Sequence, residues 1–255
     1  MKSKTETASV IAFYLLLLGG WQLLFILKLV PDYIFPAPTQ VGRRIYEIFT
    51  DNLLWPSIRA TFGRMILGFA VAVLIGLTIG IGMGMIGFLN RCFKSVFLGL
   101  LTLPTAAWTP IALLLFGLSD KAIYFVIVMS AAPAIAISTS ESIRRIPLIY
   151  LQAAQTLGTP SWQIPFKIML PAAFPSLLTG IKLGWTLGWH GAVSAELIKS
   201  TVGLGFLLQM GRELNDAPQV IGIMIVTIII GLFVDRFLFG TIERRVYQRW
   251  GLASK

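Results

Sequence analysis

The sequence predicts an all-α integral membrane protein with about six transmembrane helices. Apolar residues make up 56% of the 255 positions and charged residues only 13%, and the mean hydropathy is +0.81. Soluble domains carry about 25% charged residues. A spanning helix needs about 20 mostly apolar residues. Stretches of this length occur at 8–27, 64–87, 93–118, 121–143, 173–197 and 219–240.

The basic residues predict how the chain is oriented. A net charge of +10 would suggest a nucleic-acid partner in a soluble protein. Here most lysines and arginines fall in alternate loops and at both ends, as in Arg144-Arg145 and Arg244-Arg245. By the positive-inside rule both termini lie in the cytoplasm, which requires an even number of spans. The charge therefore orients the chain in a bilayer, and no nucleic-acid partner is expected.

The first apolar stretch follows Lys2 and Lys4 and could be mistaken for a signal peptide. It is as long as a bilayer is thick and no small-residue cleavage site follows it, so we expect a retained helix. Between it and the second stretch, Pro31, Pro36 and Pro38 predict an extended external crossing. The helical spacing after Pro38 then predicts an amphipathic helix at the outer interface, although a binding role for it stays open.

Two further segments suggest how the helices meet. Gly76, Gly80 and Gly84 clear one helix face for close packing, either against the same chain or against a second copy. Pro104 and Pro110 interrupt the third stretch, and broken backbone at membrane depth is tolerated where it lines a cavity or is satisfied by protein. Pro104, Thr105 and Trp108 are thus candidates for a translocation path. The alternative is a simple kink satisfied by the hydroxyls of Thr105 and Thr109.

A polar interval at 147–171 separates the fourth and fifth stretches. Leu148, Leu151, Ala154 and Leu157 have helical spacing, and Gly158 followed by Pro160 predicts the end of a short helix. The interval contains Gln152-Ala153-Ala154, then Gly158, then Ile168-Met169-Leu170-Pro171. In these residues the chain resembles the permeases of binding-protein-dependent ABC importers, whose signature is E-A-A, three residues, G, nine residues, I-x-L-P. Glutamine replaces the glutamate of the pattern.

The resemblance narrows to the nitrate, sulfonate, taurine and bicarbonate group of permeases. It is carried by residues 103–118, by Ser194-Ala195-Glu196-Leu197 with Gly203-Leu204-Gly205, and by Asp235-Arg236 with Glu243-Arg244-Arg245. It implies a type I importer fold in the bacterial inner membrane, a pair of permeases that is expected to be two copies of this chain, and an external substrate-binding protein. It also implies that ATPase subunits dock on the interval at 147–171, with these contact residues: Gln152, Ala153, Ala154, Gly158, Ile168, Leu170 and Pro171.

We expect the chain to have three parts. An N-terminal transmembrane helix and external amphipathic segment are expected at 1–63, the permease core at 64–250 and a cytoplasmic tail at 251–255. The chain contains no G-x-x-x-x-G-K-[ST] phosphate-binding loop. We therefore expect that it is not an enzyme, that it holds no cofactor, and that the partner ATPase binds ATP and Mg²⁺.

The fifth stretch carries further candidates for the translocation path, because ionisable groups inside a bilayer usually face the bundle interior. Trp185, Trp189, His190 and Glu196 lie in it. His190 is the only histidine and either donates to an anion or satisfies a neighbouring helix. The tryptophans either stack on a solute or pack, and Glu196 is expected to serve as a structural partner or a gate.

Small anions are the expected solutes, and a thiamine pyrimidine precursor is an alternative. From another class, an ion-coupled secondary transporter would work without an ATPase, but such proteins usually carry inverted repeats, and none is obvious here. A membrane scaffold that transports nothing is the third possibility.

Overall fold

The computed structural model describes residues 4–27, 35–160, 162–198 and 202–250, and in these ranges every regular element is helical. The helices are α1 (Lys4–Ile26), α2 (Pro38–Thr50), α3 (Leu54–Met85), α4 (Gly87–Thr102), α5 (Trp108–Phe116), α6 (Asp120–Arg144), α7 (Leu148–Thr156), α8 (Leu170–Glu196), α9 (Leu204–Glu213), α10 (Ala217–Phe233) and α11 (Gly240–Arg249). π-Helical segments at Pro165–Met169 and Val234–Phe239 lead into α8 and α11.

Four helical stretches are long and apolar enough to cross a membrane, namely Leu54–Met85, Asp120–Arg144, Pro165–Glu196 and Ala217–Arg249. A fifth crossing would be α4 together with α5, which are bent by 97° at the break between them. In the described part of α1, Leu15–Ile26 forms only a shorter apolar helix. The all-α membrane fold is confirmed, whereas the count of six spans is not.

The stretch predicted as one span at 93–118 is broken at Pro104. Leu103 is extended, with φ −74° and ψ 130°, because a following proline disfavours the helical conformation of the residue before it. A single 3-10 turn, Thr105–Ala107, then leads into α5. The second and last spans also differ from the expected ranges: α3 begins at Leu54, and the helix from Ala217 continues to Arg249.

The core is built by α3, α6 and α8, which pack side by side. A Cβ added to Gly76, Gly80 or Gly84 would lie 2.7, 2.6 and 2.9 Å from side-chain atoms of Ile135, Thr139 and Ile143 on α6. The glycine face of α3 therefore lets the two backbones approach closely. Of the two packing partners left open by the sequence, the intrachain one is confirmed.

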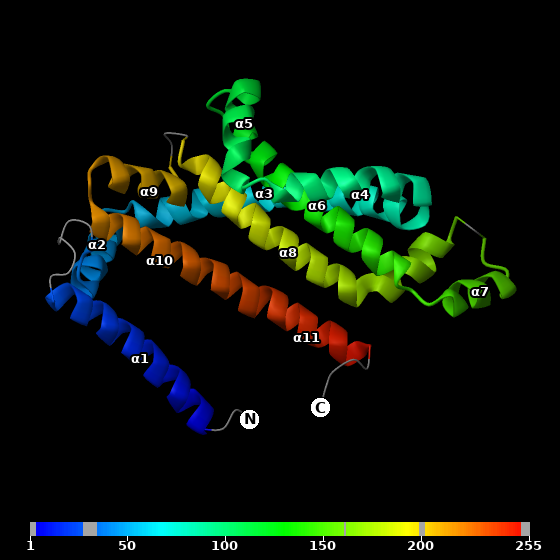
Figure 1. Ribbon diagram of the computed structural model, residues 1–255, viewed down its shortest axis with the longest axis horizontal. Helices are drawn as coiled ribbons and strands as arrows, with labels where there is room; N and C mark the ends of the chain where they lie inside the picture. The colour runs from blue at the N-terminus through cyan, green and yellow to red at the C-terminus, as the bar shows by residue number, and fades with distance from the viewer. Residues whose placement is uncertain (1–3, 28–34, 161, 199–201, 251–255) are drawn as a thin grey trace.

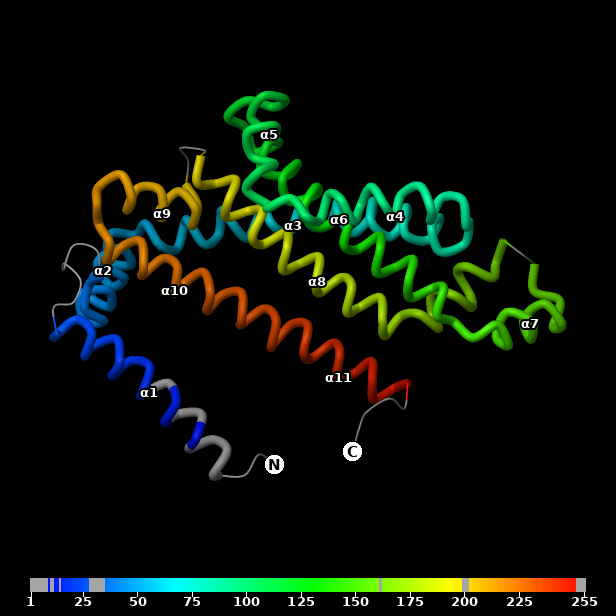
Figure 2. Tube along the Cα trace, in the orientation of Figure 1, coloured from blue at the N-terminus to red at the C-terminus, as the bar shows by residue number. Residues whose placement is uncertain are grey.

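The molecule is elongated along its spanning helices, with α7 at one end and α2 and α9 at the other (Figure 1). The trace of α8 connects these two ends (Figure 2). α5 projects sideways from the middle of the bundle, and α1 leaves the bundle beyond α2 (Figure 1). The Trp21 indole donates a hydrogen bond of 3.0 Å to the Pro36 carbonyl, which ties α1 to the start of α2.

The amphipathic helix expected after Pro38 is α2, and its apolar face is buried through Val41 and Ile48. Arg44 forms an ion pair of 2.7 Å with Asp216 at the start of α10, so α2 is fixed to the end of the bundle. The crossing expected at Pro31 and the tail expected at 251–255 lie outside the described residues.

Candidate functional site

The interval at 147–171 folds into α7 and a turn that returns the chain to α8. Pro147 precedes α7, and Gly158 ends it with φ +74°, a conformation that glycine adopts without steric cost. The amide of Thr159 donates to the Ala154 carbonyl at 3.0 Å, and the amide of Gly158 donates to the Gln155 carbonyl at 2.9 Å. This pair of bonds is a Schellman motif, which satisfies the last carbonyls of the helix.

Of the residues expected to bind an ATPase, Gln152 and Ala153 lie on the exposed side of α7, and most of the others are also at least partly exposed. Gln152, Ala153, Gly158 and Pro171 are exposed, Ile168 and Leu170 are half-buried, and Ala154 is buried. The apolar side expected from the spacing is only partly covered, because Leu148 is 70% and Leu157 is 84% exposed. The exposed Trp162 and Phe166 add to this surface, so the end of the bundle at α7 presents an apolar patch with glutamine in it.

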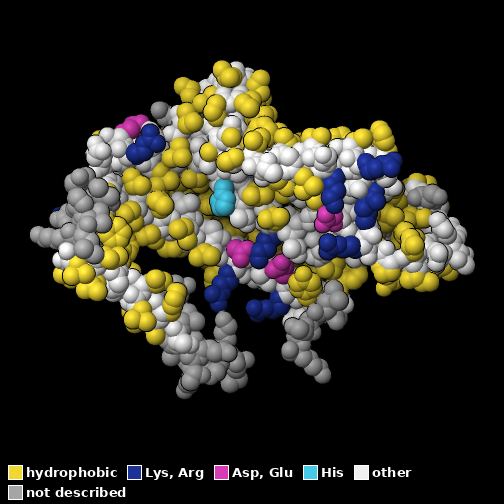
Figure 3. Space-filling view, in the orientation of Figure 1, with side chains coloured by type: hydrophobic (Ala, Val, Ile, Leu, Met, Phe, Trp, Pro, Cys, Tyr) yellow, Lys and Arg dark blue, Asp and Glu magenta, His cyan; other side chains and the backbone are white. Residues whose placement is uncertain are grey.

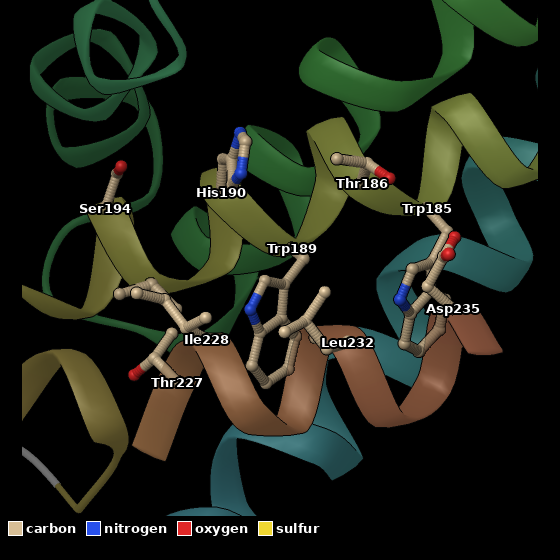
Figure 4. A pocket seen from close by; sticks show the side chains of 11 residues that line it. Trp185, Thr186, Trp189, His190, Ser194, Thr227, Ile228, Leu232 and Asp235 are labelled. Carbon is tan, nitrogen blue, oxygen red and sulfur yellow. The ribbon is translucent and has the colours of Figure 1, made fainter. Parts of the chain in front are cut away.

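A cavity of about 520 Å³ lies between α8 and α10, and three of the predicted path residues line it. They are Trp185, Trp189 and His190. Figure 4 shows the two indoles reaching from α8 toward α10, with His190 on another side of α8. His190 is exposed, whereas the two tryptophans are buried.

Both tryptophans also pack in an aromatic cluster. Such packing is the alternative to stacking on a solute. The ring centroid of Trp185 lies 5.1 Å from that of Phe69 in an edge-to-face arrangement, and the centroid of Trp189 lies 5.8 Å from that of Phe62. The indole nitrogen of Trp185 is nevertheless buried without an acceptor in the described part of the chain. Trp185 thus packs in the cluster, and its indole N–H remains as a hydrogen-bond donor beside the cavity.

Asp235, which lines this cavity, belongs to a cluster of charged groups. Lys182 on α8 pairs with Asp235 at 3.0 Å and with Glu243 at 3.5 Å. Figure 3 shows this face covered mostly by apolar side chains, with basic and acidic side chains gathered together in a few places. These contacts of Lys182 join α8 to the last span.

Residues 72–246 match the family described as the binding-protein-dependent transport system inner membrane component. The chain belongs to this family.

Relatives of this permease are named for the transport of different solutes. It is 30% identical over 219 residues to the taurine transport system permease protein TauC of Escherichia coli, which covers 84% of this chain and 80% of that protein. It is 34% identical over 204 residues to the bicarbonate transport system permease protein CmpB of Synechococcus elongatus, covering 80% and 71%. It is 31% identical over 212 residues to the nitrate import permease protein NrtB of Synechocystis, covering 80% and 77%.

A solved structure of the MetNI methionine ABC transporter in an inward-facing conformation is similar to the permease, with a TM-score of 0.59 at 21% identity. The similarity covers 72% of this chain and 93% of that chain. It supports the type I importer fold. The family resemblance drawn from the interval at 147–171 and the assignment to a multi-pass inner-membrane protein are confirmed, while the orientation of the termini stays a prediction.

Glu196 of the permease lies outside the cavity, at the end of α8 opposite to α7. Its carboxylate is 2% exposed and accepts hydrogen bonds from Thr61 at 2.8 Å, from Arg64 at 2.7 Å and from the Gly205 amide at 3.1 Å. A Cβ on Gly203 would lie 2.5 Å from the Glu196 carboxyl carbon. The close approach explains why glycines follow Glu196 in the sequence.

Sequence reasoning gave Glu196 as a structural partner or a gate, but it did not identify Thr61 and Arg64 as the residues that bind it. The available signal was Arg64 itself, the one charged residue of the apolar stretch predicted at 64–87, which requires a counter-charge. The remaining path candidates, Pro104, Thr105 and Trp108, do not line the cavity between α8 and α10. Trp108 is buried and packs edge-to-face on Phe125 at 6.3 Å. The assignment of all these residues to a path stays a prediction.

Proposed function

We propose that this permease is the membrane-spanning subunit of an ATP-driven importer for a small anion, assembled as two copies with two ATPase subunits and an external binding protein. The relatives named for taurine, nitrate and bicarbonate support the solute class. ATP and Mg²⁺ are bound by the ATPase, and the termini lie in the cytoplasm.

The observation that carries the proposal is the surface of α7. An apolar patch that includes exposed Leu148, Leu157 and Trp162 is uncommon on a surface without a partner. Gln152 and Ala153 stand on the exposed side of the same helix. A short helix with small residues fits a groove of the ATPase closely, and the positive φ of Gly158 fixes the direction in which the chain leaves the groove.

In this arrangement the ATPases bring the two copies of α7 together when they close on ATP. The π-helical segment Pro165–Met169 contacts α7 and continues into α8 without a break in the helix. The displacement of α7 therefore reaches α8, which lines the cavity with Trp189 and His190. Rocking of rigid helices around a central site is the general basis of alternating access.

The test is uptake into vesicles that contain the permease, its ATPase and its binding protein. Uptake of labelled taurine, nitrate or bicarbonate is expected only when ATP is supplied on the side of the membrane where the ATPase is bound. Uptake by the permease alone, driven by an ion gradient, would instead establish a secondary transporter.

A pair of variants tests the docking role of α7. Gly158→Val cannot adopt φ +74° without strain, and we expect it to abolish uptake while the ATPase still hydrolyses ATP. Gly158→Asn is the matched control, because asparagine tolerates this conformation far better. Normal uptake by Gly158→Val would refute the docking role, and equal loss of folded protein in both variants would show that the turn serves folding alone.

A further inference from the structure

A second cavity lies near the end of the bundle opposite to α7, between α5, the end of α8 and α9. Its volume is about 460 Å³, within the range of roughly 300–1,000 Å³ that is usual for small-molecule sites. Its polar lining comes from all three helices: Thr109 on α5, Ser194 on α8, and Gln209, Arg212 and Glu213 on α9. None of the functions described above uses this cavity.

Thr109 supplies a buried donor that has no partner within the described ranges. The side chain is 2% exposed, and its Oγ1 accepts or donates no hydrogen bond there. A threonine in a helix normally donates to the carbonyl four residues earlier, as Thr78 donates to Leu74 at 2.7 Å. A buried hydroxyl without a partner is destabilising, because it has lost its hydrogen bonds to water. Thr109 lines the cavity, so a bound solute would satisfy it.

The cavity also carries one positive and one negative side chain that do not neutralise each other. Arg44, Arg64 and Lys182 all have acidic partners, but Arg212 and Glu213 form no ion pair with each other or with another described residue. The Glu213 carboxylate accepts a hydrogen bond of 2.8 Å from the Gln209 side chain, which holds it in place. A bare anion at Arg212 would be repelled by Glu213, whereas a zwitterion would use both charges.

We propose that this cavity is an outer subsite for the transported solute and that the solute is a small aminoalkanesulfonate. Arg212, Thr109 and Ser194 offer donors from three helices, which matches the three oxygens of a sulfonate. Glu213 then faces the ammonium group at the other end of the same molecule. This inference rests on the proposed import of solutes with a small anionic group and narrows these solutes to sulfonates that also carry an ammonium group.

The test measures how well each solute protects a single cysteine of the permease, in the assembled transporter, against a thiol reagent. The only native cysteine is Cys92, which is exposed, so Cys92→Ser gives a background without thiols. Ala106→Cys then places a reporter in the cavity lining, at an exposed position. The rate of its modification by impermeant 2-sulfonatoethyl methanethiosulfonate is measured with no solute, with taurine, with isethionate, which has a hydroxyl in place of the ammonium group, and with nitrate.

We expect taurine to slow the modification most, isethionate less, and nitrate not at all. Arg212→Gln should weaken protection by both sulfonates about tenfold, since a charge-assisted hydrogen bond is lost. Glu213→Gln should remove only the advantage of taurine over isethionate. Arg43→Gln is the control, because Arg43 is an exposed arginine on α2 that is 83% accessible and pairs with Glu47; it should leave protection unchanged.

Absence of protection by taurine, or protection that survives Arg212→Gln, overturns the subsite. Equal protection by taurine and isethionate in the unmodified cavity overturns the zwitterion. ATP-driven uptake in the same vesicles separates this inference from the proposed function: uptake without protection refutes the subsite alone, and absence of any ATP-driven uptake refutes the proposed function.

Discussion

The carboxylate of Glu196 accepts a hydrogen bond from the Thr61 hydroxyl at 2.8 Å, although the two residues are 135 positions apart. The same hydroxyl accepts from the Leu204 amide at 2.9 Å. Thr61 thus connects α8 and the start of α9 to α3. With Arg64 it forms a buried polar cluster in which each group satisfies another.

Arg64→Gln is expected to destabilise the permease strongly, because Glu196 would keep a buried negative charge without its cation. The side chain of Arg64 is 12% exposed and that of Glu196 is 2% exposed. Breaking a buried ion pair by removal of one partner costs about 3–5 kcal/mol. Thermal unfolding of the detergent-solubilised protein, followed by tryptophan fluorescence, measures the loss. Arg43→Gln serves as the surface control, and a melting temperature for Arg64→Gln equal to that of the control would contradict the role of the cluster.

Gly80→Ala tests the close packing of α3 on α6. The added methyl group would lie 2.6 Å from the Thr139 Cβ and 2.7 Å from the Ala136 carbonyl oxygen. Overpacking of this kind costs about 1–3 kcal/mol. Gly63 is the matched control on the same helix, since a Cβ there meets no atom within 4 Å.

The comparison is made by the unfolding temperature of the two variants. Gly63→Ala is expected to gain up to about 1 kcal/mol from helix propensity, so the two changes should act in opposite directions. Equal effects would mean that α3 and α6 do not pack closely in the membrane.

Lys182 and Asp235 should behave as a coupled pair. Lys182→Gln and Asp235→Asn each remove one side of a contact of 3.0 Å. We expect the double variant to lose less stability than the sum of the single variants, with an interaction energy of about 0.5–3 kcal/mol. Strict additivity in the unfolding temperatures of the four proteins would show that the ion pair contributes nothing.

Gln152→Glu should tighten the contact with the ATPase. A hydrogen bond to a charged group is worth about 1 kcal/mol more than a neutral one, which corresponds to about fivefold in Kd. Titration of the purified ATPase against the permease measures this change. Gln155→Glu is the control, since Gln155 is also exposed on α7 but lies outside the signature residues. The same tightening in both variants would indicate a general charge effect instead of a specific contact.

The sequence predicted the class and the short helix in the interval at 147–171 because both depend on local patterns. Apolar runs of bilayer length indicate membrane helices, and the spacing from Leu148 to Gly158 indicates one short helix with a defined end. The bend between α4 and α5 was only partly predicted. Two prolines indicated an interruption, but the angle of 97° depends on how α5 packs against α6.

Contacts between distant residues could not be predicted in the same way. Nothing near Glu196 in the sequence indicates Thr61 or Arg64, and nothing near Lys182 indicates Asp235. The cavity at Thr109 depends on three helices that meet only in the folded chain. Such pairings depend on how α3, α8 and α9 pack against one another. The pattern of a single sequence does not show which residues of two packed helices lie side by side.

The helix from Pro165 to Glu196 has 32 residues and therefore extends for about 48 Å. Its two ends are fixed differently: one leads to the exposed surface at α7 that we propose for docking, and the other is held by the buried carboxylate of Glu196. A rod fixed at its far end turns a sideways push into rotation about that pivot. The largest displacement of α8 would then occur at the end next to α7 and the smallest beside Thr61, so the bundle could stay shut at Glu196 while it opens at α7.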